Sequence, residues 1–324
     1  MDLRFLSENR FMVQPPEESP VEEVFARDWE KMLARHAQPE FELLRDMCIE
    51  LSFPVGEGQS KTPEFLAAAK RGQLPQNREG MWLPAKPDGV KVYLHPTPVG
   101  RLPVIECQSD EDFIRLHQSL ACRCEPCHVP DSRGASIIKN YNNWARVNLH
   151  RAATGAFPTD PTLYRDYIAL LSHRYYSGVK PEAFGLGAAD WRQKSLVLRR
   201  EHEAAHYMTQ RYYHSAKSEI HDEIIADFMG LTAVFGEYDP HKFLTFMGLE
   251  DSTALREGGR LEVYLPEMEI SGADFDVLCD TIRRAALHIA ELPAKTDADR
   301  IRTFHALCRT SVANMALGRI NFSA

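Results

Sequence analysis

The segment RREHEAAHYMTQRYY, residues 199–213, decides how the second half of this chain is organised. It is strongly helical in composition, and within it His202, Glu203 and His206 form the pattern H-E-x-x-H. Residues four apart share one helix face, so both imidazoles can reach one tetrahedral ion while Glu203 contacts a metal-bound water. Chance alone would produce this pattern about 0.04 times in such a chain. The sequence therefore predicts a metal site here, and the alternative is a surface helix with two solvated histidines.

A third ligand is expected from the next helical segment, SEIHDEIIADFMGL, residues 218–231. Glu223 lies seventeen residues after His206, and Asp227 follows four residues later on the same helix face. If Glu223 binds the metal, Asp227 is placed to accept the N–H of a liganding histidine and to fix its tautomer. Three neighbouring residues are rival third ligands: Glu219, His221 and Asp222.

These two segments together resemble the gluzincin metallopeptidases, the thermolysin-like group. The resemblance covers residues 201–230, less than a tenth of the chain, and includes the string EIIADFMG at residues 223–230. It implies zinc bound by His202, His206 and Glu223. It also implies Glu203 as the general base and Asp227 as the carboxylate that orients a histidine. The connector between the two helices is short for that group.

The chemistry that this resemblance implies is hydrolysis of a peptide or other amide bond. Zinc lowers the pKa of its bound water, and Glu203 takes the proton and delivers it to the leaving group. The developing oxyanion needs a donor from a later element, and Tyr264 and His241 are the first candidates. Further candidates lie on a later predicted helix: Arg283, Arg284 and His288.

Two other classes of protein share parts of this pattern. Two histidines and a carboxylate also form the iron site of non-haem oxygenases, and E-x-x-H, here Glu203 to His206, recurs in di-iron bundles. A di-iron site would need further inward carboxylates, such as Glu219 beside Glu223, and a second E-x-x-H is missing from the helical half. The other alternative is a non-catalytic protein that keeps a zincin frame for binding, although it would not need Glu203.

A cluster of metal-capable residues lies in the stretch ACRCEPCHVP. Its members are Cys122, Cys124, Cys127 and His128. Four such side chains within seven residues predict a candidate second, structural zinc site, although a compact knuckle needs a partner such as Cys107 or His117. The alternative is a set of reduced or redox-active thiols without a metal.

The fold class that these patterns predict is α+β. Residues 1–135 form a mixed α/β region with a small sheet, and residues 136–324 form a mainly helical, zincin-like region that carries the metal site. Strands are expected at residues 90–94 and 102–107 and within 136–149, and a loop or hairpin strand at 256–267. Helices are expected within 20–51, where Pro39 divides two of them, from about 162, and at 190–214, 219–235, from 240, 273–291 and 297–317.

Composition narrows the function classes. Thirty-eight Lys and Arg stand against 46 Asp and Glu, a net charge of −8, with no run of basic residues longer than a pair. We therefore do not expect a protein built for binding nucleic acid. No segment approaches 18 consecutive apolar residues, and the N-terminus lacks the apolar core of a signal peptide, so we expect no membrane partner. Seven cysteines, an odd number, indicate a reducing cytoplasm.

Overall fold

The computed structural model describes residues 4–9, 11, 20–34, 40–75, 82–214, 219–251, 255–264 and 272–322. The chain divides into two compact units, one of Val21–His173 and one of Met1–Pro20 with Arg174–Ala324. The expected fold class, α+β with one small sheet and a mainly helical C-terminal part, is confirmed. The division differs from the expected one, because it falls after residue 173 rather than after residue 135.

Unit Val21–His173 is built on a four-stranded mixed sheet. Its strands are β1 (Val90–Thr97), β2 (Gly100–Cys107), β3 (Ala135–Asn142) and β4 (Arg165–Ser172). They lie in the order β1-β2-β4-β3, and only the central pair β2 and β4 is parallel. Because β3 and β4 complete the sheet that β1 and β2 begin, a boundary at residue 135 would have cut through it.

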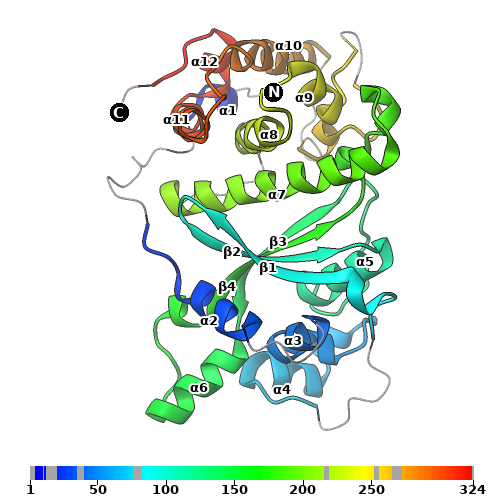
Figure 1. Cartoon of the computed structure of the whole chain (residues 1–324), viewed down its shortest axis with the longest axis vertical. Helices are drawn as coiled ribbons and strands as arrows, with labels where there is room; N and C mark the ends of the chain where they lie inside the picture. The colour runs from blue at the N-terminus through cyan, green and yellow to red at the C-terminus, as the bar shows by residue number, and fades with distance from the viewer. Residues whose placement is uncertain are drawn as a thin grey trace. The chain divides into compact units, whose positions relative to one another are not determined.

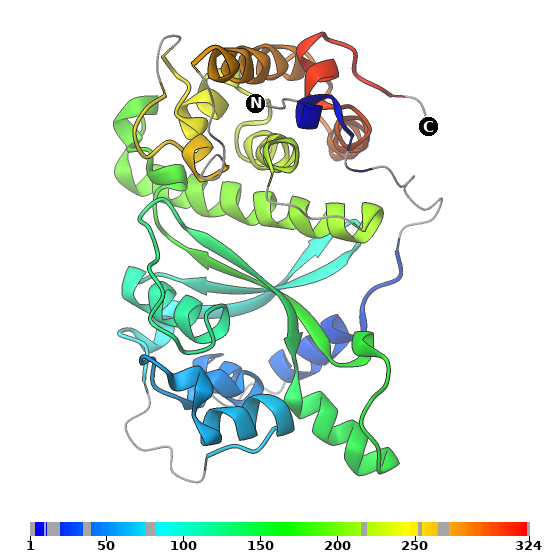
Figure 2. The ribbon, with the colours of Figure 1, turned by 180° about the vertical axis from the view of Figure 1, so that it is seen from behind.

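Helices of the same unit gather on one face of this sheet (Figures 1 and 2). They are α2 (Val24–Leu33), α3 (Glu40–Met47), α4 (Pro63–Arg71), α5 (Asp110–Leu120) and α6 (Trp144–Thr154). Trp29 of α2 is fully buried, and its indole N–H donates to the buried Asp166 of β4 at 2.9 Å. This bond ties the helical layer to the central strand.

Residues 136–172 differ most from the expected elements. The stretch expected to be one or two strands is β3 followed by α6, because the buried Asn143 caps the helix by accepting from the Arg146 N–H. Strand β4, RDYIALLS, lies where helix was expected. It is buried along nearly its whole length, and a short continuous apolar run does not distinguish a buried strand from a buried helix.

Unit Met1–Pro20 with Arg174–Ala324 is helical in its described residues. Its helices are α1 (Arg4–Ser7), α7 (Ala188–Tyr213), α8 (Ile220–Phe235), α9 (Pro240–Met247), α10 (Gly272–Ile289), α11 (Asp297–Cys308) and α12 (Val312–Ala316). Helix α8 is seen nearly end-on beside the long α7 in both views, so the two cross steeply (Figures 1 and 2). Residues 220–232 of α8 are all buried, which makes this helix the centre of the unit.

Short 3-10 turns join these elements. They are Ile49–Ser52, Gln59–Lys61, Pro87–Gly89, Pro161–Leu163, Tyr176–Gly178, Pro181–Phe184 and Arg260–Tyr264. The last of these occupies the place of the expected loop or hairpin strand, of which residues 265–267 lie outside the described part of the chain. No helix in the described ranges is long and apolar enough to cross a membrane.

Candidate metal centre

Helix α7 places His202 and His206 one turn apart on the same face. Their Nε2 atoms lie 3.1 Å from each other, with ring centroids 4.7 Å apart. His202 is only 5% exposed, and the side chain of His206 is 12% exposed. The two imidazoles therefore converge on one point inside this unit.

Glu223 joins them from the first turn of α8. Its carboxylate oxygens lie 3.4 Å from His202 Nε2 and 3.5 Å from His206 Nε2. A tetrahedral zinc ion with bonds of about 2.0–2.1 Å requires ligand atoms separated by about 3.3 Å. The three observed separations bracket this value. Among the described residues of this unit, these three form the group whose ligand atoms converge closely enough for one ion.

A carboxylate holds the outer nitrogen of each histidine. His202 Nδ1 lies 3.0 Å from Asp227 Oδ1, and His206 Nδ1 lies 2.9 Å from Asp222 Oδ2. A carboxylate accepts, so each Nδ1 carries the proton and each Nε2 presents a lone pair. When both imidazoles are neutral, two lone pairs 3.1 Å apart repel each other, so either a proton or a metal ion must lie between them, and the donor arrangement fits a metal ion.

Asp227 is itself held by two further side chains. The Tyr176 hydroxyl donates to Asp227 Oδ1 at 2.6 Å, and the Arg260 guanidinium binds Asp227 Oδ2. Arg260 also donates to the Tyr176 hydroxyl at 2.8 Å, and its Nε lies 3.8 Å from Glu223. This network fixes Asp227 and, through it, the ring of His202.

The buried charged groups of the centre carry excess negative charge, which a divalent cation would balance. Asp222, Glu223 and Asp227 are each at most 4% exposed, and Arg260 is the cation that pairs with two of them. With neutral imidazoles, these four groups carry two net negative charges. Burial alone would lower the pKa of His206, but the charges of Asp222 and Glu223 raise it to about 10.

The carboxyl groups show the complementary effect. Burial would raise the pKa of Glu223, but hydrogen bonding and charge from His202 and His206 hold that pKa below its usual range. The pKa of Asp227 is also lowered against its burial, chiefly by the charge of Arg260. Without a metal, therefore, the centre keeps its carboxylates ionised and takes up protons on its imidazoles.

The expected catalytic residues lie in different places. Glu203 is half-buried on α7, close enough that its charge acts on His206. Tyr264, at the end of the turn Arg260–Tyr264, is half-buried, and burial together with the charge of Glu223 raises the pKa of its hydroxyl. His241 is exposed on the first turn of α9 and is not part of the converging group, because that helix buries Phe243 and other apolar residues.

The other candidates from the sequence have other contacts. The ring of His221 donates to the Leu307 carbonyl of α11 at 3.0 Å, so it points away from the centre. Asp222 is not a converging ligand and holds His206 instead. Glu219 precedes α8 and lies outside the converging group of described residues. On α10, Arg283 donates to the Asp251 carbonyl, Arg284 pairs with Asp280, and His288 faces Gly318.

Sequence reasoning missed Tyr176 and Arg260. They are 84 residues apart, and each lies in a short 3-10 turn outside the two metal-binding helices. Neither position carries a local motif, so only the folded chain brings them to Asp227.

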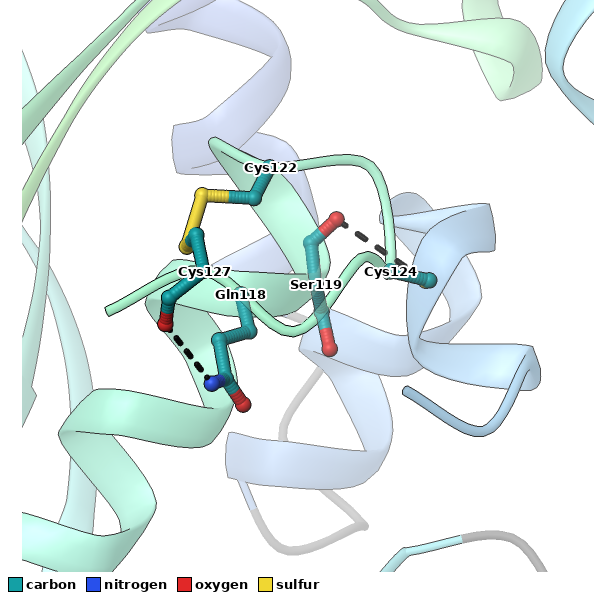
Figure 3. Close-up of a disulfide and its surroundings, with 5 residues drawn as sticks. All are labelled: Gln118, Ser119, Cys122, Cys124 and Cys127. Atoms are coloured by element: carbon teal, nitrogen blue, oxygen red, sulfur yellow. Dashed lines mark hydrogen bonds between the residues drawn. A yellow bond between two sulfur atoms is a disulfide. The ribbon is translucent and has the colours of Figure 1, made fainter. Parts of the chain in front are cut away.

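The cysteine cluster of unit Val21–His173 differs from the expected knuckle. Cys122 and Cys127 form a disulfide (Figure 3). Cys124 is buried with its Sγ 3.3 Å from the Glu50 carbonyl, and His128 is exposed. The four residues therefore do not converge on one ion, because Cys124 has a left-handed backbone (φ 62°) within the tight loop and its thiol is directed into the core.

Comparison with known proteins places the chain in a family. No curated protein and no solved structure matches it with statistical significance. One family profile matches residues 2–319, nearly the whole chain. The chain therefore belongs to the family described as a family of unknown function (DUF7005).

Proposed function

We propose that this protein is a zinc-dependent metallohydrolase that cleaves a peptide or other amide bond. The observation that carries the proposal is the convergence of His202, His206 and Glu223 at separations of 3.1–3.5 Å, with both outer nitrogens held by carboxylates. Imidazole nitrogens and a carboxylate oxygen are ligands that zinc prefers, and three protein ligands leave a position for water. When bound, zinc would supply Lewis-acid chemistry, polarising a water molecule and a substrate carbonyl.

In this proposal, residues of the chain carry out the proton transfer and stabilise the oxyanion. The Glu203 carboxylate accepts a proton from the attacking water and returns it to the leaving amine. Tyr264, rather than the exposed His241, is the residue that we assign as donor to the developing oxyanion, because burial and the charge of Glu223 raise the pKa of its hydroxyl and keep it protonated. Arg260 and Tyr176 keep Asp227 ionised and oriented toward His202.

We infer the class of substrate from the net charge, and the cellular compartment from the state of the cysteines. A net charge of −8 without a basic stripe favours a peptide substrate over a nucleic acid. We place the protein in the cytoplasm because five of its seven cysteines, Cys48, Cys107, Cys124, Cys279 and Cys308, are unpaired and buried.

Turnover on an unbiased peptide mixture tests this function. The zinc-loaded protein is incubated with peptides from a whole-proteome digest, and new termini are identified by mass spectrometry. We expect cleavage that falls about 10²–10⁴-fold in Glu203→Gln, which removes the proton acceptor while leaving the zinc ligands in place. Glu201→Gln is the matched control, since Glu201 lies on the same helix and pairs with Arg200.

Three results would overturn the proposal. If neither the peptides nor small amide substrates are cleaved, the zinc frame serves binding alone. Equal turnover by Glu203→Gln would exclude Glu203 as the base. Iron in the centre, with oxygen consumption, would assign the protein to the non-haem oxygenases.

A further inference from the structure

A second group of metal-binding side chains lies at the C-terminal end of α5, in the unit that does not hold the metal centre. His117, Cys122 and Cys127 each offer a ligand atom, and these atoms lie within 4.8 Å of one another. His117 is on the last turn of α5, and the two cysteines lie on the loop that follows. Figure 3 shows their sulfurs joined as a disulfide.

The imidazole of His117 gives an independent indication of a ligand. His117 is 3% exposed as a residue, and its Nδ1 is buried without a hydrogen-bond partner among the described residues. A buried polar atom without a partner costs free energy, and most buried polar atoms avoid it. Desolvation, with the charge of Arg133, lowers the pKa of His117 to about 4, so the ring is neutral near pH 7. Neutral imidazole is the form that binds metals.

The loop geometry explains why these residues meet and why Cys124 does not join them. Arg123 and Cys124 both have a left-handed backbone, with φ of 55° and 62°, which reverses the chain after α5. The side chain of Gln118 then holds the returning loop by donating to the Cys127 carbonyl at 3.0 Å, as drawn in Figure 3. The reversal brings Cys127 to Cys122 and turns the Cys124 thiol toward the Glu50 carbonyl.

We propose that the reduced thiols of Cys122 and Cys127, together with His117, form a second zinc site that disulfide formation abolishes. Two thiolates and one imidazole are a zinc donor set, and the fourth position is open to solvent because both cysteines are only half-buried. This site replaces the contiguous cluster expected from the sequence, since His117 takes the place of Cys124 and His128.

The disulfide form and the reduced, zinc-binding form interconvert by reduction and by thiol–disulfide exchange. A phosphine reductant converts the disulfide and one water into two thiols and a phosphine oxide, and zinc binding then releases the two thiol protons. In the opposite direction, a small disulfide accepts two electrons from the pair of thiolates. Its two halves leave as thiolates, the Cys122–Cys127 bond forms, and zinc is set free.

Zinc content of the wild-type chain in its two redox forms tests this proposal. One sample is reduced with a phosphine and the other is oxidised with oxidised glutathione. Both are equilibrated with zinc, freed of unbound metal and measured by inductively coupled plasma mass spectrometry. We expect about one more zinc per chain in the reduced form. Cobalt loaded into the reduced form should show thiolate-to-metal charge-transfer absorption that the oxidised form lacks.

Matched variants identify the ligands. Cys122→Ser, Cys127→Ser and His117→Gln should each remove the additional ion from the reduced form. Cys124→Ser and His128→Gln should retain it, because neither side chain belongs to the converging group. Equal zinc content in both redox forms would overturn the proposal. Loss of the additional ion in Cys124→Ser or His128→Gln would also overturn it, in favour of the contiguous cluster.

Discussion

Arg260 determines the charge balance of the metal centre, since it is the guanidinium that pairs with Asp227 and approaches Glu223. We predict that Arg260→Met lowers the free energy of unfolding of the metal-free protein by about 3–5 kcal/mol, because buried carboxylates lose their partner. Bound zinc supplies the missing positive charge, so its stabilising effect should be larger in the variant than in the wild type. Urea denaturation with and without zinc measures both quantities.

Arg284→Met is the control for this prediction. Arg284 pairs with Asp280 in the open, with side chains 60% and 57% exposed, and such pairs contribute little to stability. A variant at Arg260 that unfolds like the control would mean that the guanidinium does not compensate the centre.

Asp222 orients His206 without being a converging ligand. Removal of a carboxylate that holds a liganding histidine weakens metal binding by about 10–100-fold, and we predict this for Asp222→Asn. Competition with a chromophoric chelator gives the zinc dissociation constant. Asp280→Asn, an exposed position on α10, should leave the constant unchanged. An unchanged constant in Asp222→Asn would show that the bond of 2.9 Å to His206 does not tune the centre.

Protons compete with zinc for His206. Its pKa is raised to about 10 in the metal-free fold, so the proton stabilises that fold at neutral pH and this contribution is lost as pH rises through 10. Zinc must displace this proton, so its affinity should rise about tenfold per pH unit between pH 6 and 8 for each proton released. Calorimetric titration in two buffers of different ionisation heat counts the protons. Zinc binding without proton release would contradict the prediction.

At the scale of elements, the crossing of α7 and α8 positions all three ligands. Gly230 of α8 lies against α7 so closely that a Cβ atom there would come within 2.8 Å of the Leu198 carbonyl and 3.1 Å of its side chain. We predict that Gly230→Ala costs about 1–3 kcal/mol of stability, because backbone cannot move aside as a flexible side chain can. Thermal unfolding compared with Gly272→Ala, where a Cβ meets open space, measures the effect. Equal stability of the two variants would mean that the crossing is loose.

The elements that the sequence predicted well are those with strong local patterns. Helix α7 is found at Ala188–Tyr213 and α8 at Ile220–Phe235, within a few residues of the expected bounds, because periodicity and turn residues mark their ends. Strand β4 was missed because its burial comes from partners on both sides in the sheet, which the segment itself does not reveal. Helix α6 was also missed. It begins at a capping residue, but the β-branched residues before it favoured the prediction of a strand.

Across the whole molecule, contacts between residues close in sequence could be predicted, whereas contacts between distant residues could not. His202, His206 and Glu223 lie within 22 positions on two adjacent helices, so spacing predicted the histidine pair and the resemblance to the gluzincins indicated Glu223 among its neighbours. Tyr176 and Arg260 reach the centre only through the fold of the unit. In the cysteine loop, the motif suggested four contiguous ligands, but the left-handed residues Arg123 and Cys124 send the side chains in different directions.

The zinc content of the whole chain, kept in its oxidised form, tests the central claim most directly. Inductively coupled plasma mass spectrometry of the freshly purified protein should find about one zinc per chain, and none in His206→Ala. The oxidised form is chosen so that the Cys122–Cys127 pair cannot contribute an ion. Iron in place of zinc, or the same zinc content in His206→Ala as in the wild type, would contradict the assignment of His202, His206 and Glu223 as a zinc site.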